Sequence, residues 1–214
     1  ADEAGLLLWQ DMPLQWGYAR SVRKQAVRQA REAVDLLGHH PSIALWCGHN
    51  EPMTIEDTEL RGSILRKAAL GAKVAAQQQL PTWNKTVLDR SLKRSLEGAD
   101  STRPVIAHSG AVPHPPRFDG TDAHLYFGWY WGEERSFPNF LRTVPRMARF
   151  VTEFGAQAVP SGDGADWMQP RRWPYLDWDR LKHSHGLQKT IFDRYVPPVD
   201  YASFDAWSDA TQRY

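Results

Sequence analysis

The stretch Ser42-Ile-Ala-Leu-Trp-Cys-Gly-His-Asn-Glu51 decides the fold of this chain. A short run of β-branched and aromatic residues that ends near a glycine is typical of a buried parallel strand. A second run, Phe150-Val-Thr-Glu153, is followed by Phe-Gly, so each run ends in a glutamate. When helices separate parallel strands, polar groups at the carboxyl ends of the strands converge at one mouth. The two runs therefore predict that Glu51 and Glu153 lie at the same edge of a sheet.

The rest of the chain alternates between strand-like and helix-like segments. Apolar runs predict five strands, at residues 6–9, 43–47, 104–107, 123–127 and 150–153. Helical spacing predicts helices at residues 22–37, 59–79, 84–96 and 139–144, with Asn84 as the N-cap of the third. This alternation implies an α/β fold with parallel strands and helical crossovers.

Five strands do not close an eight-stranded barrel, which usually needs ~250 residues. No Gly-rich phosphate-binding turn follows the first strand, as it does in a doubly wound nucleotide fold, so part of a barrel is favoured over an open sheet. No linker divides the chain, and we expect one incomplete domain over residues 1–214. Residues 160–178 carry three Trp and predict an ordered loop over the mouth.

Composition excludes several classes of partner. The 26 basic and 25 acidic residues leave a net charge of +1, which gives no electrostatic case for nucleic acid or an anionic membrane. No run approaches the ~20 apolar residues of a membrane span. The lone Cys47 permits no internal disulfide and predicts a small buried thiol. The ten Trp residues, several of them near strand ends, favour a carbohydrate cleft because aromatic rings stack on the apolar faces of sugars.

Five stretches, in order along the chain, resemble glycoside hydrolase family 2, in particular its β-mannosidase-like members. They are Ala1-Asp-Glu-Ala-Gly-Leu-Leu-Leu-Trp-Gln-Asp11, His40-Pro-Ser-Ile-Ala-Leu-Trp46, His49-Asn-Glu51, Asp122-Ala-His-Leu-Tyr126 and Val151-Thr-Glu-Phe-Gly-Ala-Gln157. The resemblance implies a retaining exo-β-glycosidase on a (β/α)8 TIM barrel, of which this chain holds about strands three to seven. It implies no cofactor, a β-linked carbohydrate substrate, and flanking β-sandwich domains in the full protein. The resemblance implies that the chain begins inside a domain, so its location is left open, with the cytoplasm favoured.

The resemblance also implies the roles of individual residues. Glu51, at the end of strand four, would be the acid/base, and Glu153, at the end of strand seven, would be the nucleophile. Asn50 would hydrogen-bond the sugar hydroxyl next to the anomeric carbon. Tyr126 would hydrogen-bond the nucleophile.

Four further residues complete the expected substrate pocket. Trp9 and Asp11 would line it from strand three, and Trp129 belongs to the group of Trp near strand ends. His124 alternates with Tyr126 along a strand, so both point the same way. A histidine satisfied within the core is the alternative for His124.

Two other pairs of polar residues are not expected to form a catalytic or metal site. The adjacent Glu133 and Glu134 are expected to be solvated charges, because neighbouring residues seldom face one substrate together. His183 and His185 have no Cys or Glu partner that completes a metal set, so no metal is expected. Three functions stay open: a retaining β-glycosidase, most closely a β-mannosidase; a non-catalytic carbohydrate-binding or degenerate barrel; and a fragment that is inert without its missing strands.

Overall fold

The computed structural model describes residues 1–53, 80–110, 122–129, 133–162 and 167–214, together with residues 69, 72, 73, 76 and 77. Most of the helix predicted at residues 59–79 lies outside the described residues. The chain divides into two compact units, which are described separately. The first comprises residues 1–124 and 145–152, and the second comprises residues 125–144 and 153–214. No helix within the described ranges is both long and apolar enough to cross a bilayer.

A three-stranded parallel sheet in the order β1-β2-β3 forms the centre of the first unit. Its strands are β1 (Leu8–Asp11), β2 (Ile43–Cys47) and β3 (Val105–Ile106). The parallel pairing confirms the mixed α/β fold predicted from the sequence. The prediction was wrong for residues 6 and 7, because the exposed Leu6 and Leu7 precede the strand.

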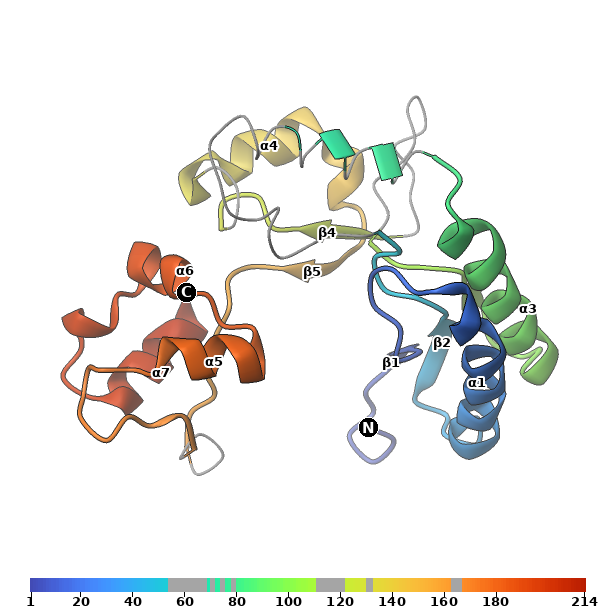
Figure 1. Cartoon of the computed structure of the whole chain (residues 1–214), viewed down its shortest axis with the longest axis horizontal. Coiled ribbons are helices and arrows are strands. Elements are labelled where there is room, and N and C mark those ends of the chain that lie inside the picture. The colour runs from blue at the N-terminus through green and yellow to red at the C-terminus, as the bar shows by residue number, and fades with distance from the viewer. Residues whose placement is uncertain are drawn as a thin grey trace. The chain divides into compact units, whose positions relative to one another are not determined.

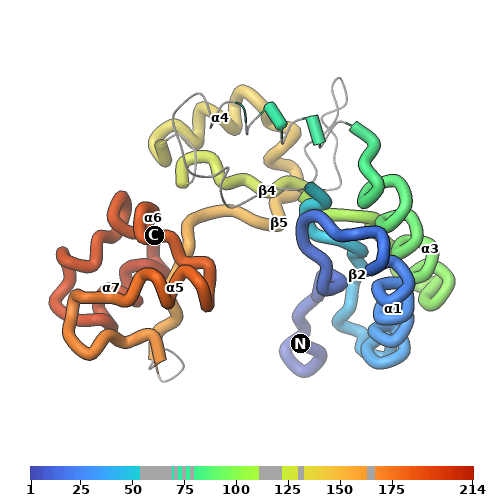
Figure 2. Tube along the Cα trace, in the orientation of Figure 1, coloured from blue at the N-terminus to red at the C-terminus, as the bar shows by residue number. Residues whose placement is uncertain are grey.

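Two helices pack side by side in this unit (Figures 1 and 2). They are α1 (Arg23–Leu37), preceded by a 3₁₀ turn at Arg20–Val22, and α3 (Asp89–Ala99), preceded by a π-helical segment at Asn84–Leu88. Apolar residues at helical spacing on both helices meet β2 in one core. The fully buried members are Trp46, Leu88, Leu92 and Leu96.

The prediction that Asn84 is the N-cap of the helix at residues 84–96 was wrong. The helix begins at Trp83, one residue before Asn84, and the Thr82 hydroxyl accepts a hydrogen bond from the Lys85 N–H at 3.3 Å. The Asn84 side chain instead accepts a hydrogen bond from the Tyr18 N–H at 3.1 Å. Its amide group therefore ties the helix to the segment that follows β1.

A two-stranded sheet is formed by β4 (Ala123–Leu125) and β5 (Val151–Phe154). These strands lie close to their predicted positions, although β4 ends two residues early. The chain passes between the two units within each of these strands.

The second unit is mostly helical (Figure 2), and it has an aromatic core of its own. Its helices are α4 (Phe137–Thr143), α5 (Trp178–His185), α6 (Lys189–Tyr195) and α7 (Phe204–Arg213). Trp207 and Phe192 are fully buried at 5.3 Å between ring centroids. The predicted loop at 160–178 contributes Trp173 and Trp178 to this core, a packing role that its composition alone did not indicate.

Asp100 anchors the carboxyl end of α3 to β2. It is buried, and its carboxylate accepts hydrogen bonds from Trp46 Nε1 at 2.9 Å and from Arg103 at 2.7 Å. Burial by itself raises the pKa of Asp100, but hydrogen bonds from Thr102, Trp46 and Arg103 outweigh it and hold this pKa well below its usual range.

The depressed pKa of Asp100 predicts how stability depends on pH. Its stabilising contribution is present above the unfolded pKa of about 4 and is lost as pH falls through the lower folded pKa. We expect Asp100→Asn to reduce the free energy of unfolding by about 1–3 kcal/mol at pH 7, with a difference from the parent that shrinks below about pH 4. Urea titrations between pH 7 and pH 2 measure this. A difference that stayed constant over the whole range would contradict it.

Candidate active site

The segment after β2 continues the ladder of the sheet beyond the end of the strand. The Asn50 N–H donates to the Leu14 carbonyl at 2.8 Å, and the Asn50 carbonyl accepts from the Trp16 N–H at 3.0 Å. On the other side, the Glu51 N–H donates to the Ser109 carbonyl at 3.2 Å. Main-chain bonds to both neighbouring segments therefore fix Asn50 and Glu51 at the carboxyl end of β2.

Glu51 has a backbone conformation that residues with a side chain rarely adopt. Its φ is 45°, in the left-handed region, and Trp16 has a φ of 65°. Such residues are uncommon outside glycine, cost about 1–3 kcal/mol each and cluster at functional sites. The ladder around Glu51 supplies the contacts that hold it in this conformation.

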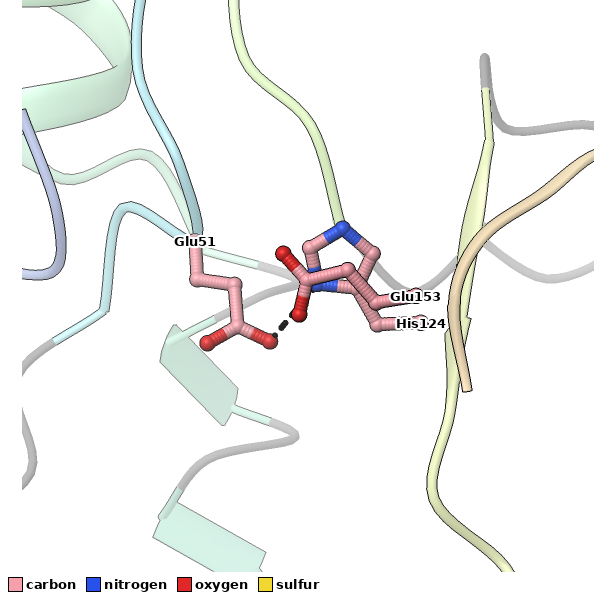
Figure 3. A group of neighbouring side chains, drawn as sticks. All are labelled: Glu51, His124 and Glu153. Carbon is pink, nitrogen blue, oxygen red and sulfur yellow. Dashed lines mark hydrogen bonds and ion pairs between the residues drawn. The ribbon is translucent and has the colours of Figure 1, made fainter. Parts of the chain in front are cut away.

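The carboxyl group of Glu51 has a partner on each oxygen. Oε1 lies 2.9 Å from His124 Nδ1, and Oε2 accepts a hydrogen bond from Trp16 Nε1 at 3.2 Å. Figure 3 shows the His124 ring turned toward Glu51. The close approach depends on Gly110, because a Cβ there would meet the His124 ring at 2.4 Å and the Glu51 side chain at 2.9 Å.

Asp122 orients the His124 ring from its other side. Its Oδ2 lies 3.5 Å from His124 Nε2 and accepts a hydrogen bond from the Thr152 hydroxyl at 2.6 Å. The Gly110 N–H also faces this buried carboxylate, 3.2 Å from each oxygen. A carboxylate that receives several donors stays ionised and favours a proton on the facing imidazole nitrogen. In neutral His124 this proton placement leaves Nδ1 as the acceptor for a protonated Glu51.

Glu153 belongs to the second unit and lies on β5. The Tyr126 hydroxyl donates a hydrogen bond to Glu153 Oε2. A phenol that donates to a carboxylate stabilises its ionised form. Tyr126 is thus a donor to Glu153, whereas Glu51 faces a group that can also accept.

The other candidates from the sequence make contacts of their own. Trp9 Nε1 donates to Asp11 Oδ1 at 2.9 Å, so these two residues are joined on β1. Asn50 Oδ1 accepts from the Ser109 hydroxyl at 3.1 Å. Trp129, in the second unit, packs edge-on against Phe137 at 5.1 Å, and its buried Nε1 has no hydrogen-bond partner among the described residues.

Two predictions about ordinary residues are confirmed. Glu133 pairs with Arg135 on the surface, where both side chains are exposed, as expected for solvated charges. Cys47 is a free, buried thiol, and burial raises its pKa far above the usual range. At neutral pH this thiol is therefore neutral and poorly nucleophilic.

Several residues around Glu51 were not assigned to the site from the sequence. Trp16 was one of the ten Trp residues counted in the sequence, but its bond to Glu51 was not predicted. Asp122 begins one of the five stretches that resemble glycoside hydrolase family 2, but nothing in its spacing indicated that it orients His124. Ser109 stands in an ordinary Ser-Gly pair after β3, which gave no signal of its bond to Asn50.

Comparison with known proteins bears on this geometry. No family model matches the chain. Over 175 residues it is 31% identical to β-mannosidase B of Thermothelomyces thermophilus. This alignment covers 75% of this chain and 18% of the relative. Over 212 residues it is 30% identical to the β-mannosidase of Bos taurus, and this alignment covers 86% of this chain and 21% of the relative. The chain thus spans about a fifth of the length of these curated relatives.

One solved structure resembles the chain over most of its length. The β-D-mannosidase from Dictyoglomus thermophilum matches with a TM-score of 0.52 and 17% identity, covering 96% of this chain and 24% of that one. At this identity the likeness concerns the fold alone. It agrees with the parallel α/β arrangement of β1, β2 and β3.

Proposed function

Because the chain is homologous to β-mannosidases of glycoside hydrolase family 2 and spans about a fifth of their length, we propose that it forms part of the catalytic domain of a retaining exo-β-glycosidase. In this proposal β1 to β5 are strands three to seven of a (β/α)8 barrel. The remaining strands and any β-sandwich domains belong to sequence outside these 214 residues. The observation that carries the proposal is the environment of Glu51: a strained glutamate at the end of a buried parallel strand, with an imidazole on one carboxyl oxygen.

Glu51 is the proposed acid/base. In the first step it protonates the glycosidic oxygen as the bond to the anomeric carbon breaks. The acceptor nitrogen of His124 and the Trp16 N–H support this role, because together they hold the carboxyl group in one orientation. In the second step the Glu51 carboxylate takes a proton from water, which attacks the glycosyl-enzyme.

Glu153 is the proposed nucleophile. Its carboxylate attacks the anomeric carbon and forms a covalent glycosyl-enzyme, which water then releases with net retention. The Tyr126 hydroxyl supports this role, because a hydrogen bond to the carboxylate stabilises the ionised form. Asn50 would hydrogen-bond the substrate hydroxyl next to the anomeric carbon, with Trp9, Asp11 and Trp129 as further pocket residues.

A non-catalytic carbohydrate-binding barrel is the competing function. Such a protein has no need of two carboxylates with different partners, nor of a glutamate held at a positive φ. Loss of turnover on substitution of either glutamate distinguishes the two.

Retention sets the distance between the two carboxyl groups. We expect the carboxyl groups of Glu51 and Glu153 to lie ~5–5.5 Å apart in the complete enzyme, because the nucleophile must touch the sugar directly. A crystal structure of the protein expressed from its whole coding sequence measures this separation. A separation of ~6.5–9.5 Å would point to inversion.

The two glutamates should respond differently to substitution. Glu153→Ala should lose nearly all turnover of an aryl β-mannoside. Glu51→Ala should still form the glycosyl-enzyme with an activated leaving group, and azide should restore turnover and yield the β-glycosyl azide, because azide needs no general base. Steady-state rates, with and without azide, and intact-protein mass measure this. Glu133→Ala, at an exposed glutamate, is the control that should keep parental rates. No azide rescue of Glu51→Ala and no glycosyl-enzyme mass would show that the roles are wrong.

The sugar preference follows from the hydroxyl on carbon two. A site built to hydrogen-bond an axial hydroxyl rejects an analogue that presents it wrongly, since the polar groups of the site are then left unpaired. We expect a higher kcat/KM for an aryl β-mannoside than for the β-glucoside or β-galactoside. Assays of all three under one set of conditions measure this. A preference for the glucoside or galactoside would leave the proposed mechanism standing and show that mannose is not the preferred sugar.

A further inference from the structure

A fully buried carboxylate, Asp89, lies between two histidines that no step of the proposed mechanism uses. Asp89 Oδ1 is 2.7 Å from His49 Nδ1, and both side chains are completely buried. Asp89 Oδ2 is 2.9 Å from His108 Nδ1, within ion-pair distance but without the geometry of a good hydrogen bond. The His108 side chain is 25% exposed. We call these three residues the His–Asp–His cluster.

The cluster joins α3 to the two segments that hold the candidate acid/base. His49 immediately precedes Asn50 and Glu51, and His108 immediately precedes Ser109. The His49 carbonyl accepts from the Ser109 N–H at 2.9 Å, and the Ser109 carbonyl accepts from the Glu51 N–H. Through His49 and His108, Asp89 thus connects the two chain segments whose main-chain bonds fix Glu51.

The π-helical segment Asn84–Leu88 ends at the residue before Asp89. A π-turn within a helix is rare and is frequently found at functional sites. It places a charged residue at a position of α3 that is fully buried. A buried carboxylate is costly unless it is paired, which explains why two imidazoles face it.

The two rings that face Asp89 differ in burial. His49 Nε2 is buried and has no hydrogen-bond partner among the described residues. His49 Nδ1 faces Asp89 Oδ1 at 2.7 Å and is placed to donate to it. The ring of His108, on the other oxygen of Asp89, reaches solvent. Lys85 also lies near Asp89: burial lowers the pKa of Lys85, and the charge of Asp89 offsets this in part.

We propose that Asp89 is a positioning residue for the acid/base: through His49 and His108 it holds the ends of β2 and β3 together, and so fixes the backbone on which Asn50 and Glu51 are presented. This inference rests on the proposed function of Glu51. Glu51 is strained at φ 45°, and main-chain bonds to the two neighbouring segments help to keep it there. If the ends of β2 and β3 separate, the carboxyl group moves, and a displacement of ~1 Å can reduce the rate ~100-fold.

The decisive test measures how fast Asp89→Asn hydrolyses two glycosides that differ in their leaving group. The variant is made in the protein expressed from its whole coding sequence. A dinitrophenyl glycoside needs little protonation to leave, whereas a phenyl glycoside depends on the acid. We expect Asp89→Asn to lower kcat/KM on the phenyl glycoside at least ~10-fold more than on the dinitrophenyl glycoside, because kcat/KM reports the first step, in which the acid protonates the leaving group. The matched control is Asp100→Asn, which removes a buried aspartate at the other end of the same helix. At a temperature where Asp100→Asn is folded, any loss of rate in this control should be equal on the phenyl and the dinitrophenyl glycoside.

His108→Gln provides a second variant in case Asp89→Asn does not fold. It removes one arm of the cluster at a partly exposed position, and it should show the same leaving-group selectivity to a smaller degree. If both cluster variants lose the two activities equally, or behave as Asp100→Asn does, Asp89 has only a structural role and the proposal is overturned.

A measurement that needs no turnover separates this proposal from the proposed function. Hydrogen exchange at the Glu51 and Ser109 amides reports whether the two segments stay joined. We expect faster exchange at these amides in Asp89→Asn and His108→Gln than in Asp100→Asn. If the parent protein hydrolyses no aryl glycoside, the proposed function fails. Unchanged exchange in the two cluster variants would then also overturn the role of Asp89.

Discussion

The main-chain ladder on both sides of β2 is the constraint on which the first unit depends. β2 pairs with β1 on one side and with β3 on the other, and the hydrogen bonds continue past the strand to Asn50 and Glu51. Side chains of β2 fill the core beneath α1 and α3. Because a parallel strand buried on both faces cannot shift without losing its core contacts, the residues that follow it are held at a defined height and direction. A glutamate in this position needs no loop of its own to be placed accurately.

Buried aspartates extend this constraint from the sheet to its surroundings. Asp100 ties the carboxyl end of α3 to Trp46 of β2, Asp89 faces the histidines beside Glu51 and Ser109, and Asp122 orients His124. Each of these carboxylates receives donors from residues far away in the sequence. A buried charge that is fully paired adds little net stability, but a wrong arrangement would leave it unpaired at high cost. These contacts therefore select one arrangement of the strand ends more than they strengthen the fold.

The contrast between local and distant contacts explains how much could be predicted from the sequence. The bounds of β2 were predicted correctly because an apolar run with a following Gly is a local signal. β1 was placed two residues too early because Leu6 and Leu7 look like strand residues but do not pair. The helices after Trp178 went unpredicted, although local caps mark them: Asp177 and Ser203 accept from the first turns of α5 and α7, and Gly186 ends α5 at a positive φ. The position of Glu51 could be predicted, but its bonds to Trp16 and His124 span 35 and 73 residues and have no local signature.

The two glutamates differ in the kind of partner that each has within its own unit, and this difference carries chemical meaning. Glu51 faces an imidazole nitrogen whose opposite nitrogen faces an ionised carboxylate, so this nitrogen can accept a proton as well as donate one. Glu153 faces the Tyr126 hydroxyl, which donates a hydrogen bond to it and so favours its ionised form. A residue that must give up a proton and later recover it needs a partner that tolerates both states. A residue that must attack as an anion needs a partner that favours the anion alone. The contacts within each unit therefore agree with the opposite roles proposed for these two residues of the same type.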